Sequence, residues 1–143
     1  MEKLLIKGGK SLLGEIDCSG AKNAALPVIA ASILSSDDIT LQNLPYLQDI
    51  TTMFELIGSM GADISLDEKM NFKLNTSNLS NLEARYELVK TMRASILVLG
   101  SMVAKYGYAK IALPGGCAIG SRPVNYHLKA LEKLGAEISL NNG

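Results

Sequence analysis

The sequence predicts an α/β fold made of two copies of one unit, and three observations lead to this fold class. Two segments, Ala24–Leu34 and Ala94–Ala104, are apolar on nearly every side, which predicts helices buried in a protein interior. Each is followed by a short strand and an amphipathic helix. After each amphipathic helix comes the same pattern of glycine, alanine, an acidic residue, isoleucine, serine and leucine, at Gly61–Leu66 and Gly135–Leu140. This shared order of elements favours duplicated α/β units packed together over a chance match.

The expected strands are short. Leu4–Ile6 and Leu12–Ile16 flank the Gly8-Gly9 turn and predict a pair of strands at the N-terminus. Ile39–Leu41 and Lys110–Leu113 are the strands that follow the two apolar helices.

The two amphipathic helices have similar boundaries. The first is expected to begin at Asp49 as its cap and to stop at Gly61, and the second has Ser121 before it and Gly135 after it. Their apolar residues recur at helical spacing: Ile50, Met53, Ile57 and Met60 in the first, and Val124, Leu128, Leu131 and Leu134 in the second.

The C-terminal residues predict a hairpin whose second strand is missing. Ile138–Leu140 reads as a strand, and Asn142-Gly143 is a strong hairpin-turn signal. We therefore expect this chain to be a fragment of a longer protein.

Charge and composition exclude several classes of function. Lys plus Arg and Asp plus Glu both number 14, so the chain lacks the basic excess that general binding to nucleic acid or acidic membranes requires. The N-terminus has only a three-residue apolar run, shorter than a signal peptide needs, and no apolar run is long enough to cross a membrane. Two cysteines without a signal indicate reduced thiols in the cytoplasm, and one histidine with two separated cysteines cannot form a structural zinc site.

Cys117 is the strongest candidate for a chemical role. It lies in Leu113–Pro123, where three glycines and two prolines predict a shaped, exposed loop between a strand and a helix. A helix N-terminus and the nearby Arg122 both favour thiolate over thiol, which suits a nucleophile or a tuned acid. Cys18, beside the negative charge of Asp17, is interpreted as structural.

Two further cations open the apolar helices. Lys22 in Ser19–Asn23 precedes the first, and Arg93 in Lys90–Ser95 precedes the second. A cation at a helix N-terminus opposes the helix dipole, so two equivalent placements suggest that these ends bind phosphate or carboxylate together with Arg122. A solvated cation or an ion pair is the alternative for each. His127, one turn into the second amphipathic helix, is interpreted as a packing or supporting residue, because its spacing from the cysteine matches no thiol-hydrolase signature.

Several of these motifs resemble the N-terminal portion of the UDP-N-acetylglucosamine 1-carboxyvinyltransferases, a family of enolpyruvyl transferases. The motifs are Ser19–Ala25, Lys90–Ser95, Pro114–Cys117, Gly120–Val124, His127-Leu128 and Leu134–Ala136. They occur in order along almost the whole chain. The family's chain is about three times longer, which agrees with the truncated hairpin.

The resemblance implies a fold of two similar α/β domains, each made of three βαβαββ units around buried helices, an inside-out α/β barrel that is incomplete in this chain. Residues 1–20 would be strands of the other domain, which is otherwise absent. Residues 21–143 would be two repeat units of the second domain, truncated at the C-terminus.

The resemblance also implies the reaction: the enolpyruvyl group of phosphoenolpyruvate is transferred to the 3′-hydroxyl of UDP-N-acetylglucosamine, which opens peptidoglycan synthesis. Cys117 would be the proton donor and could form a covalent adduct. Lys22, Asn23 and Arg122 would bind phosphoenolpyruvate. The residues implied at the UDP-sugar are Arg93, Arg122, Pro123, Val124, Asn125 and Tyr126. Asn125 departs from the family's usual aspartate, and Tyr126 stands where a leucine or another residue is common, so the strength or detail of the nucleotide contacts is expected to differ, but not the reaction type.

No metal or cofactor is implied, and the expected location is the cytoplasm. The family's aspartate base and several arginines come from later sequence, so these 143 residues alone are expected to be inactive. The alternative hypotheses are a non-catalytic UDP-sugar-binding paralogue or fragment, and the related shikimate-pathway transferase. A thiol redox protein is disfavoured because the chain has no Cys-x-x-Cys pair.

Overall fold

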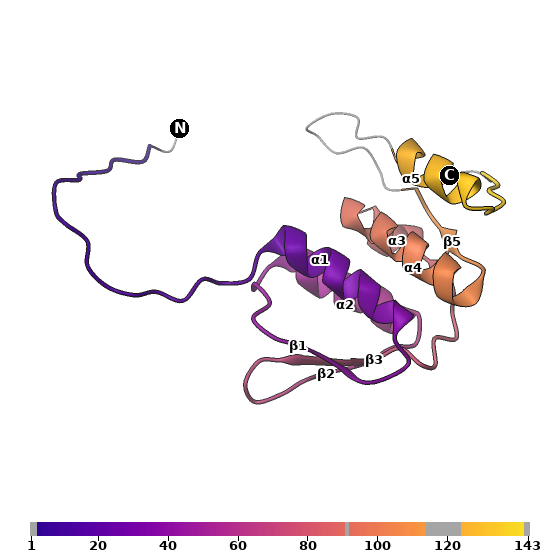
Figure 1. The fold of residues 1–143 in the computed structure, drawn as a ribbon, viewed down its shortest axis with the longest axis horizontal. Coiled ribbons are helices and arrows are strands. Elements are labelled where there is room, and N and C mark those ends of the chain that lie inside the picture. Colours follow the sequence, from indigo (N-terminus) through magenta and orange to yellow (C-terminus); the bar gives the residue numbers. More distant parts are fainter. Residues whose placement is uncertain (1–2, 91, 114–123, 142–143) are drawn as a thin grey trace.

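The chain folds into helices packed on short strands, as the sequence predicts (Figure 1). The computed structural model describes residues 3–90, 92–113 and 124–141. Cys117, Arg122, Pro123 and the predicted turn at Asn142-Gly143 lie outside the described residues.

The N-terminal residues run away from the rest of the molecule as an extended segment (Figure 1). The strands predicted at Leu4–Ile6 and Leu12–Ile16 are wrong, since residues 3–20 form neither helix nor strand. Leu12 and Leu13 are fully exposed in this segment. Two strands with nothing to cover their apolar side are only marginally stable in water, which explains the failure of the prediction.

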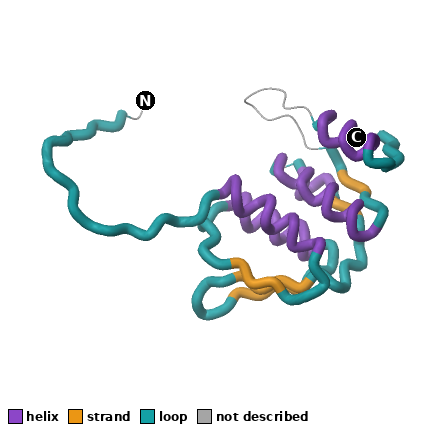
Figure 2. Tube along the Cα trace, viewed as in Figure 1, coloured by secondary structure: helices purple, strands orange, loops and turns teal. Residues whose placement is uncertain are grey.

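The first half of the molecule places two helices over a small sheet (Figure 2). In chain order its elements are α1 (Lys22–Ala31), the short 3₁₀ helix η1 (Ser32–Leu34), β1 (Ile39–Leu41), α2 (Gln48–Ser59), β2 (Asp63–Leu66) and β3 (Phe72–Asn75). The strand order is β1-β3-β2, and both pairs are antiparallel. The sequence did not predict β3, although it is the central strand.

The core lies between this sheet and the helices. Leu74 of β3 stands opposite Ile39 of β1 and Ile64 of β2, and its side chain is buried. In α2, Met53 and Ile57 are completely buried, as the helical spacing of apolar residues predicts.

The ends of α2 confirm one prediction and correct another. Gly61 lies just beyond the helix with φ of 107°, a backbone conformation that glycine adopts easily. Asp49, however, is not the cap. The cap position is occupied by Leu47, and Asp49 lies within the first turn, where a negative charge favours the helix dipole.

The second half has more helices than the first and less sheet among the described residues. Its elements are β4 (Glu83–Ala84), α3 (Tyr86–Val89), the 3₁₀ helix η2 (Arg93–Ile96), α4 (Leu97–Tyr106), β5 (Lys110–Ile111) and α5 (Asn125–Lys133). β4 pairs with β5 in parallel. The strand predicted at Ile138–Leu140 is wrong, because within the described residues no counterpart of β3 lies beside this segment to pair with it.

The predicted apolar helices exist, but they are not buried on all sides. Val28 and Leu34, in α1 and η1, are each about half exposed, and Gly100 of α4 is exposed. The second amphipathic helix, α5, has no buried residue. Between α4, β5 and α5 lies an open, mainly apolar groove of about 1260 Å³. The burial of the second half is therefore less complete than that of the first.

Lys105 at the end of α4 joins the two halves. Its ammonium donates hydrogen bonds to the carbonyl oxygens of Ser35, at 2.5 Å, and Thr76, at 3.3 Å. The hydroxyl of Tyr106 donates to the same Thr76 carbonyl at 3.1 Å, and the Thr76 hydroxyl donates to Ser32. These contacts satisfy carbonyls at the end of η1 and just after β3, so we interpret Lys105 as a structural cation.

Candidate anion-binding site

The first turn of α1 presents Lys22 at an uncapped helix start. Ala21, in the cap position, is extended and supplies no side-chain acceptor to the helix. The first bonded amides are those of Ala24 and Ala25, which donate to the carbonyl of Ala21 at 3.1 and 2.9 Å. The amides of Lys22 and Asn23 precede these bonds, as is usual at a helix N-terminus, and such amides suit an anion.

The ammonium of Lys22 lies 2.8 Å from the carboxylate of Asp49, in the first turn of α2. The two side chains remain 45% and 36% exposed, so the pair is open to solvent. An ammonium has three donors, so one carboxylate contact leaves donors available for a phosphate oxygen. The carboxylate also offsets the unfavourable placement of a cation at the start of α1.

Asn23 is the second residue of α1, and its side chain is exposed beside Lys22 on the same turn. Pro27, four residues later, has no N–H to donate to the carbonyl of Asn23. This turn therefore offers a cation, backbone amides, an amide side chain and a carbonyl oxygen within a few residues.

Arg93 opens η2, which leads directly into α4, as the sequence predicts. Its side chain is half-buried. Just before it, Lys90 donates a hydrogen bond to Glu87, and this bond raises the pKa of Lys90 above its usual value. Lys90 is thus engaged by a carboxylate, while Arg93 stands at the beginning of the second apolar helix.

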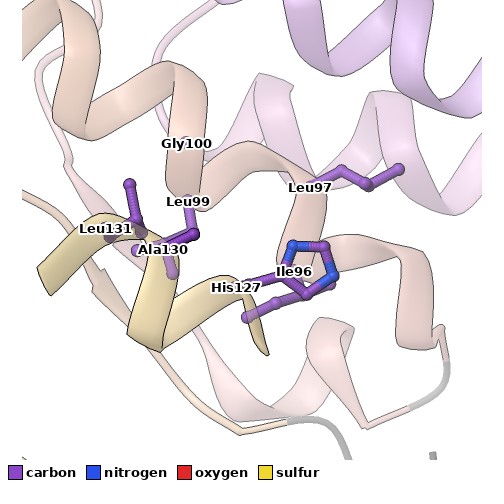
Figure 3. Close-up of a pocket in the computed structure, with 7 residues that line it drawn as sticks. All are labelled: Ile96, Leu97, Leu99, Gly100, His127, Ala130 and Leu131. Carbon is purple, nitrogen blue, oxygen red and sulfur yellow. The ribbon is translucent and has the colours of Figure 1, made fainter. Parts of the chain in front are cut away.

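Of the residues predicted at the UDP-sugar, Val124, Asn125 and Tyr126 lie at the start of α5. Val124 occupies the cap position, Asn125 is the first helical residue, and Tyr126 is 73% exposed. His127 lines a shallow pocket with Ile96 of η2 (Figure 3). His127 is exposed, and its role as a packing or supporting residue stays a prediction.

The structure packs together two of the helices that predicted site residues precede or begin. Helices α1 and α4 pack side by side and start toward the same side of the molecule, so Lys22 and Arg93 open neighbouring helices (Figure 1). The pocket shared by η2, α4 and α5 places the first turn of α5 next to the end of η2. The convergence of Lys22 and Arg93 with Arg122 and Cys117 stays a prediction, since the last two lie outside the described residues.

Sequence reasoning missed Asp49 as the partner of Lys22. It identified Asp49 as a helix cap, and the two residues are brought together only by the packing of α1 against α2. Charge alone could have suggested a carboxylate near Lys22, but not which one.

The described part of the chain shows neither a group of metal-binding side chains nor a helix that could cross a membrane. Within residues 3–90, 92–113 and 124–141, no cluster of histidine, cysteine, aspartate or glutamate could hold a metal ion. In the same ranges, every helix is too short or too polar to cross a membrane.

Three comparisons relate this chain to known proteins. The sequence profile of the family described as EPSP synthase (3-phosphoshikimate 1-carboxyvinyltransferase) matches residues 6–143. The chain is 53% identical over all 143 residues to the UDP-N-acetylglucosamine 1-carboxyvinyltransferase of Magnetococcus marinus, and it covers 34% of that relative. It therefore spans about a third of the length of the curated relative that it matches.

The fold is also similar to a solved structure. The crystal structure of the enolpyruvyl transferase NikO from Streptomyces tendae matches 71% of this chain and 24% of its own, with a TM-score of 0.59 and 25% sequence identity.

Proposed function

This chain belongs to the EPSP synthase family, and we propose that the whole protein transfers the enolpyruvyl group of phosphoenolpyruvate to the 3′-hydroxyl of UDP-N-acetylglucosamine with release of phosphate. The observation that carries the proposal is the 53% identity, along the entire chain, to a relative named for that activity. The uncapped start of α1, with Lys22 open to solvent beside Asp49, supports an anionic substrate. The proposed setting is the cytoplasm and the proposed pathway is peptidoglycan synthesis.

The proposed reaction is an addition followed by an elimination. A proton is added to C3 of phosphoenolpyruvate, which makes C2 electrophilic, and the sugar oxygen bonds to C2 as its own proton leaves. The tetrahedral intermediate then loses phosphate from C2 and a proton from C3, which restores the double bond. Fixed positive charge near the phosphate stabilises the charge that develops on it as it departs.

We assign the roles on this chain as follows. Cys117 gives the proton to C3, and Lys22 and Arg122 hold the phosphate, with Asn23 positioning the reactants. Arg93 and the residues from Arg122 to Tyr126 face the UDP-sugar. Asn125 keeps hydrogen bonding without a charge.

The proposed domain organisation follows the same reasoning. Residues 1–20 belong with a domain formed by the rest of the protein, and residues 21–143 form two repeat units of the other domain. The exposed apolar side chains of residues 3–20 support this division, because such side chains need a partner surface. The catalytic site would lie between the two domains, so the 143-residue chain alone is proposed to have no turnover.

Phosphate release tests the proposal. The complete protein, mixed with phosphoenolpyruvate and UDP-N-acetylglucosamine, is expected to release phosphate, and the 143-residue chain is not. In the complete protein, Lys22→Met is expected to lower kcat/KM by about a hundredfold, because it removes a charge at the phosphate. Lys129→Met, the same substitution at an exposed position of α5, is the matched control and should leave kcat/KM unchanged.

The outcomes separate the alternatives. Release of phosphate with shikimate 3-phosphate, but not with the UDP-sugar, would show that shikimate 3-phosphate is the acceptor. Binding of the UDP-sugar without any phosphate release would identify a non-catalytic paralogue and contradict the proposal.

A further inference from the structure

Asn43 connects the loop after β1 to the segment that leads into α1. The amide of Gly20 donates to Oδ1 of Asn43 at 3.2 Å, and Nδ2 of Asn43 donates to the carbonyl of Cys18 at 3.3 Å. Both ends of the side-chain amide are used, so the contact needs an acceptor and a donor in one short side chain. Asn43 has φ of 54°, a left-handed conformation that asparagine tolerates better than most residues.

The backbones are also in close contact at this point. A β-carbon added to Gly20 would lie 2.0 Å from the carbonyl oxygen of Asn43 and 3.4 Å from Cδ of Pro45. Only glycine fits at that distance, so the approach of the two segments is fixed sterically as well as by hydrogen bonds.

The same loop leads into the partner of Lys22. Asn43 holds the chain two to four residues before Lys22, and Asp49, six residues after Asn43, pairs with the Lys22 ammonium at 2.8 Å. The chain from β1 into α2 therefore contacts the candidate anion site in two ways. Asn43 binds the backbone that precedes α1, and Asp49 pairs with the charged side chain of Lys22.

We propose that Asn43 is a positioning residue, which holds Cys18–Gly20 so that Lys22 and the first amides of α1 are correctly placed for a phosphate group. This inference rests on the proposed function, because it assumes that Lys22 binds the phosphate of the substrate. It assigns a role in substrate binding to a residue that is itself proposed to contact neither substrate.

The exposure of these groups indicates that the contact of Asn43 with Cys18 and Gly20 affects the position of Lys22 more than the stability of the fold. Both hydrogen bonds are exposed, and neither Asn43 nor Gly20 belongs to the buried core. Water can replace exposed hydrogen bonds at little cost to the free energy of unfolding. It cannot replace the fixed geometry, and misplacing a binding group by a small distance weakens binding strongly.

Titration with inorganic phosphate, followed by the amide signals of Lys22, Asn23 and Ala24 in the complete ¹⁵N-labelled protein, tests the inference. Asn43→Gly removes the side chain and keeps the left-handed backbone accessible. It is expected to weaken phosphate binding by about tenfold with unchanged circular dichroism. Asn43→Asp keeps an acceptor for Gly20 and is expected to bind with intermediate affinity, a partial rescue.

Met70→Gly is the matched control. Met70 is also a non-glycine residue in the left-handed region, with φ of 61°, and it lies in the turn between β2 and β3. Its replacement should leave phosphate binding unchanged, which would show that a glycine in a left-handed position has no general effect. Lys22→Met should abolish the response.

The outcomes distinguish this inference from the proposed function. Suppose that Asn43→Gly binds phosphate as tightly as the unmodified protein, while Lys22→Met shows no response to phosphate. This result would overturn the role of Asn43 and leave the role of Lys22 standing. Absence of any response in the unmodified complete protein would overturn both. Loss of helical circular dichroism in Asn43→Gly would show that Asn43 is needed for folding and would also overturn its role as a positioning residue.

Discussion

At the scale of single residues, Gly61 and Gly135 show what the repeated sequence encodes. Each follows an amphipathic helix, and their φ angles are 107° and 98°. The same backbone conformation thus recurs at the same place in both copies. Their surroundings differ, because a β-carbon on Gly61 would lie 3.0 Å from the hydroxyl oxygen of Ser80, whereas no atom of the described residues lies within 4 Å of one on Gly135.

Alanine substitution at these two glycines should separate conformational strain from crowding. Both changes force a side chain into a disfavoured conformation, at a cost of about 1–2 kcal/mol in the free energy of unfolding. Gly61→Ala should cost more than Gly135→Ala, since it also crowds Ser80 and the backbone oxygen of Asn78. Urea denaturation measures both values, and an equal loss in the two variants would show that the crowding is relieved.

The candidate site illustrates what a residue pattern can and cannot predict. Lys22 at the start of α1 and Arg93 at the start of η2 follow from local sequence, because helix boundaries have local signals. Asp49 and Asn43 could not be found in this way. Each is 20 or more residues from the group that it contacts, so its role depends on how α1, β1 and α2 pack together.

At the scale of elements, helices were more predictable than strands. Helices α2 and α5 have an apolar period that only a helix satisfies, and both exist. A strand depends on a partner, which local sequence does not specify. β3 was missed although it pairs on both sides, and Ile138–Leu140 was wrongly predicted because it lacks such a partner within the described residues.

The turn between β2 and β3 is held by the carboxylate of Asp67. It accepts hydrogen bonds from the amides of Lys69 and Asn71, both at 2.9 Å, and from the side chain of Asn71 at 3.0 Å. These bonds, mainly those from Asn71, lower the pKa of Asp67 below its usual value. A carboxyl group whose pKa is lower in the folded state stabilises that state when it is ionised.

Acid should therefore loosen this turn. The contribution of Asp67 is fully present above the ordinary aspartate pKa of about 4, and it is lost as the pH falls through the lowered folded-state value. The amide signals of Lys69 and Asn71 should report this transition as the pH falls below the ordinary aspartate pKa, and Asp67→Asn should abolish it. Signals that titrate equally in the asparagine variant would assign the change to another group.

At the scale of the whole molecule, burial is uneven between the two halves. In α2 the side chain of Leu56 is completely buried, whereas Leu131 of α5 is half-buried at the edge of the groove. The first half has a three-stranded sheet under its helices, and the second has a pair of two-residue strands. The C-terminal helix should be the less stable part.

The same substitution in both helices measures this difference. Leu56→Ala removes a fully enclosed side chain and should lower the free energy of unfolding by about 2–5 kcal/mol. Leu131→Ala should lower it by about 1 kcal/mol or less, since water already reaches that side chain. Amide hydrogen exchange should likewise be faster in α5 than in α2. Slow amide exchange in α5, together with a large loss of unfolding free energy in Leu131→Ala, would show that the two halves unfold as one unit.

The order of the elements along the chain has a consequence for synthesis. The three strands of the first sheet and the two helices that cover it all come from residues 22–75. On the ribosome, this part can bury its apolar face while the rest of the chain is still being translated. The second half emerges later and then meets an ordered neighbour, so α4 can pack against an α1 that is already in place.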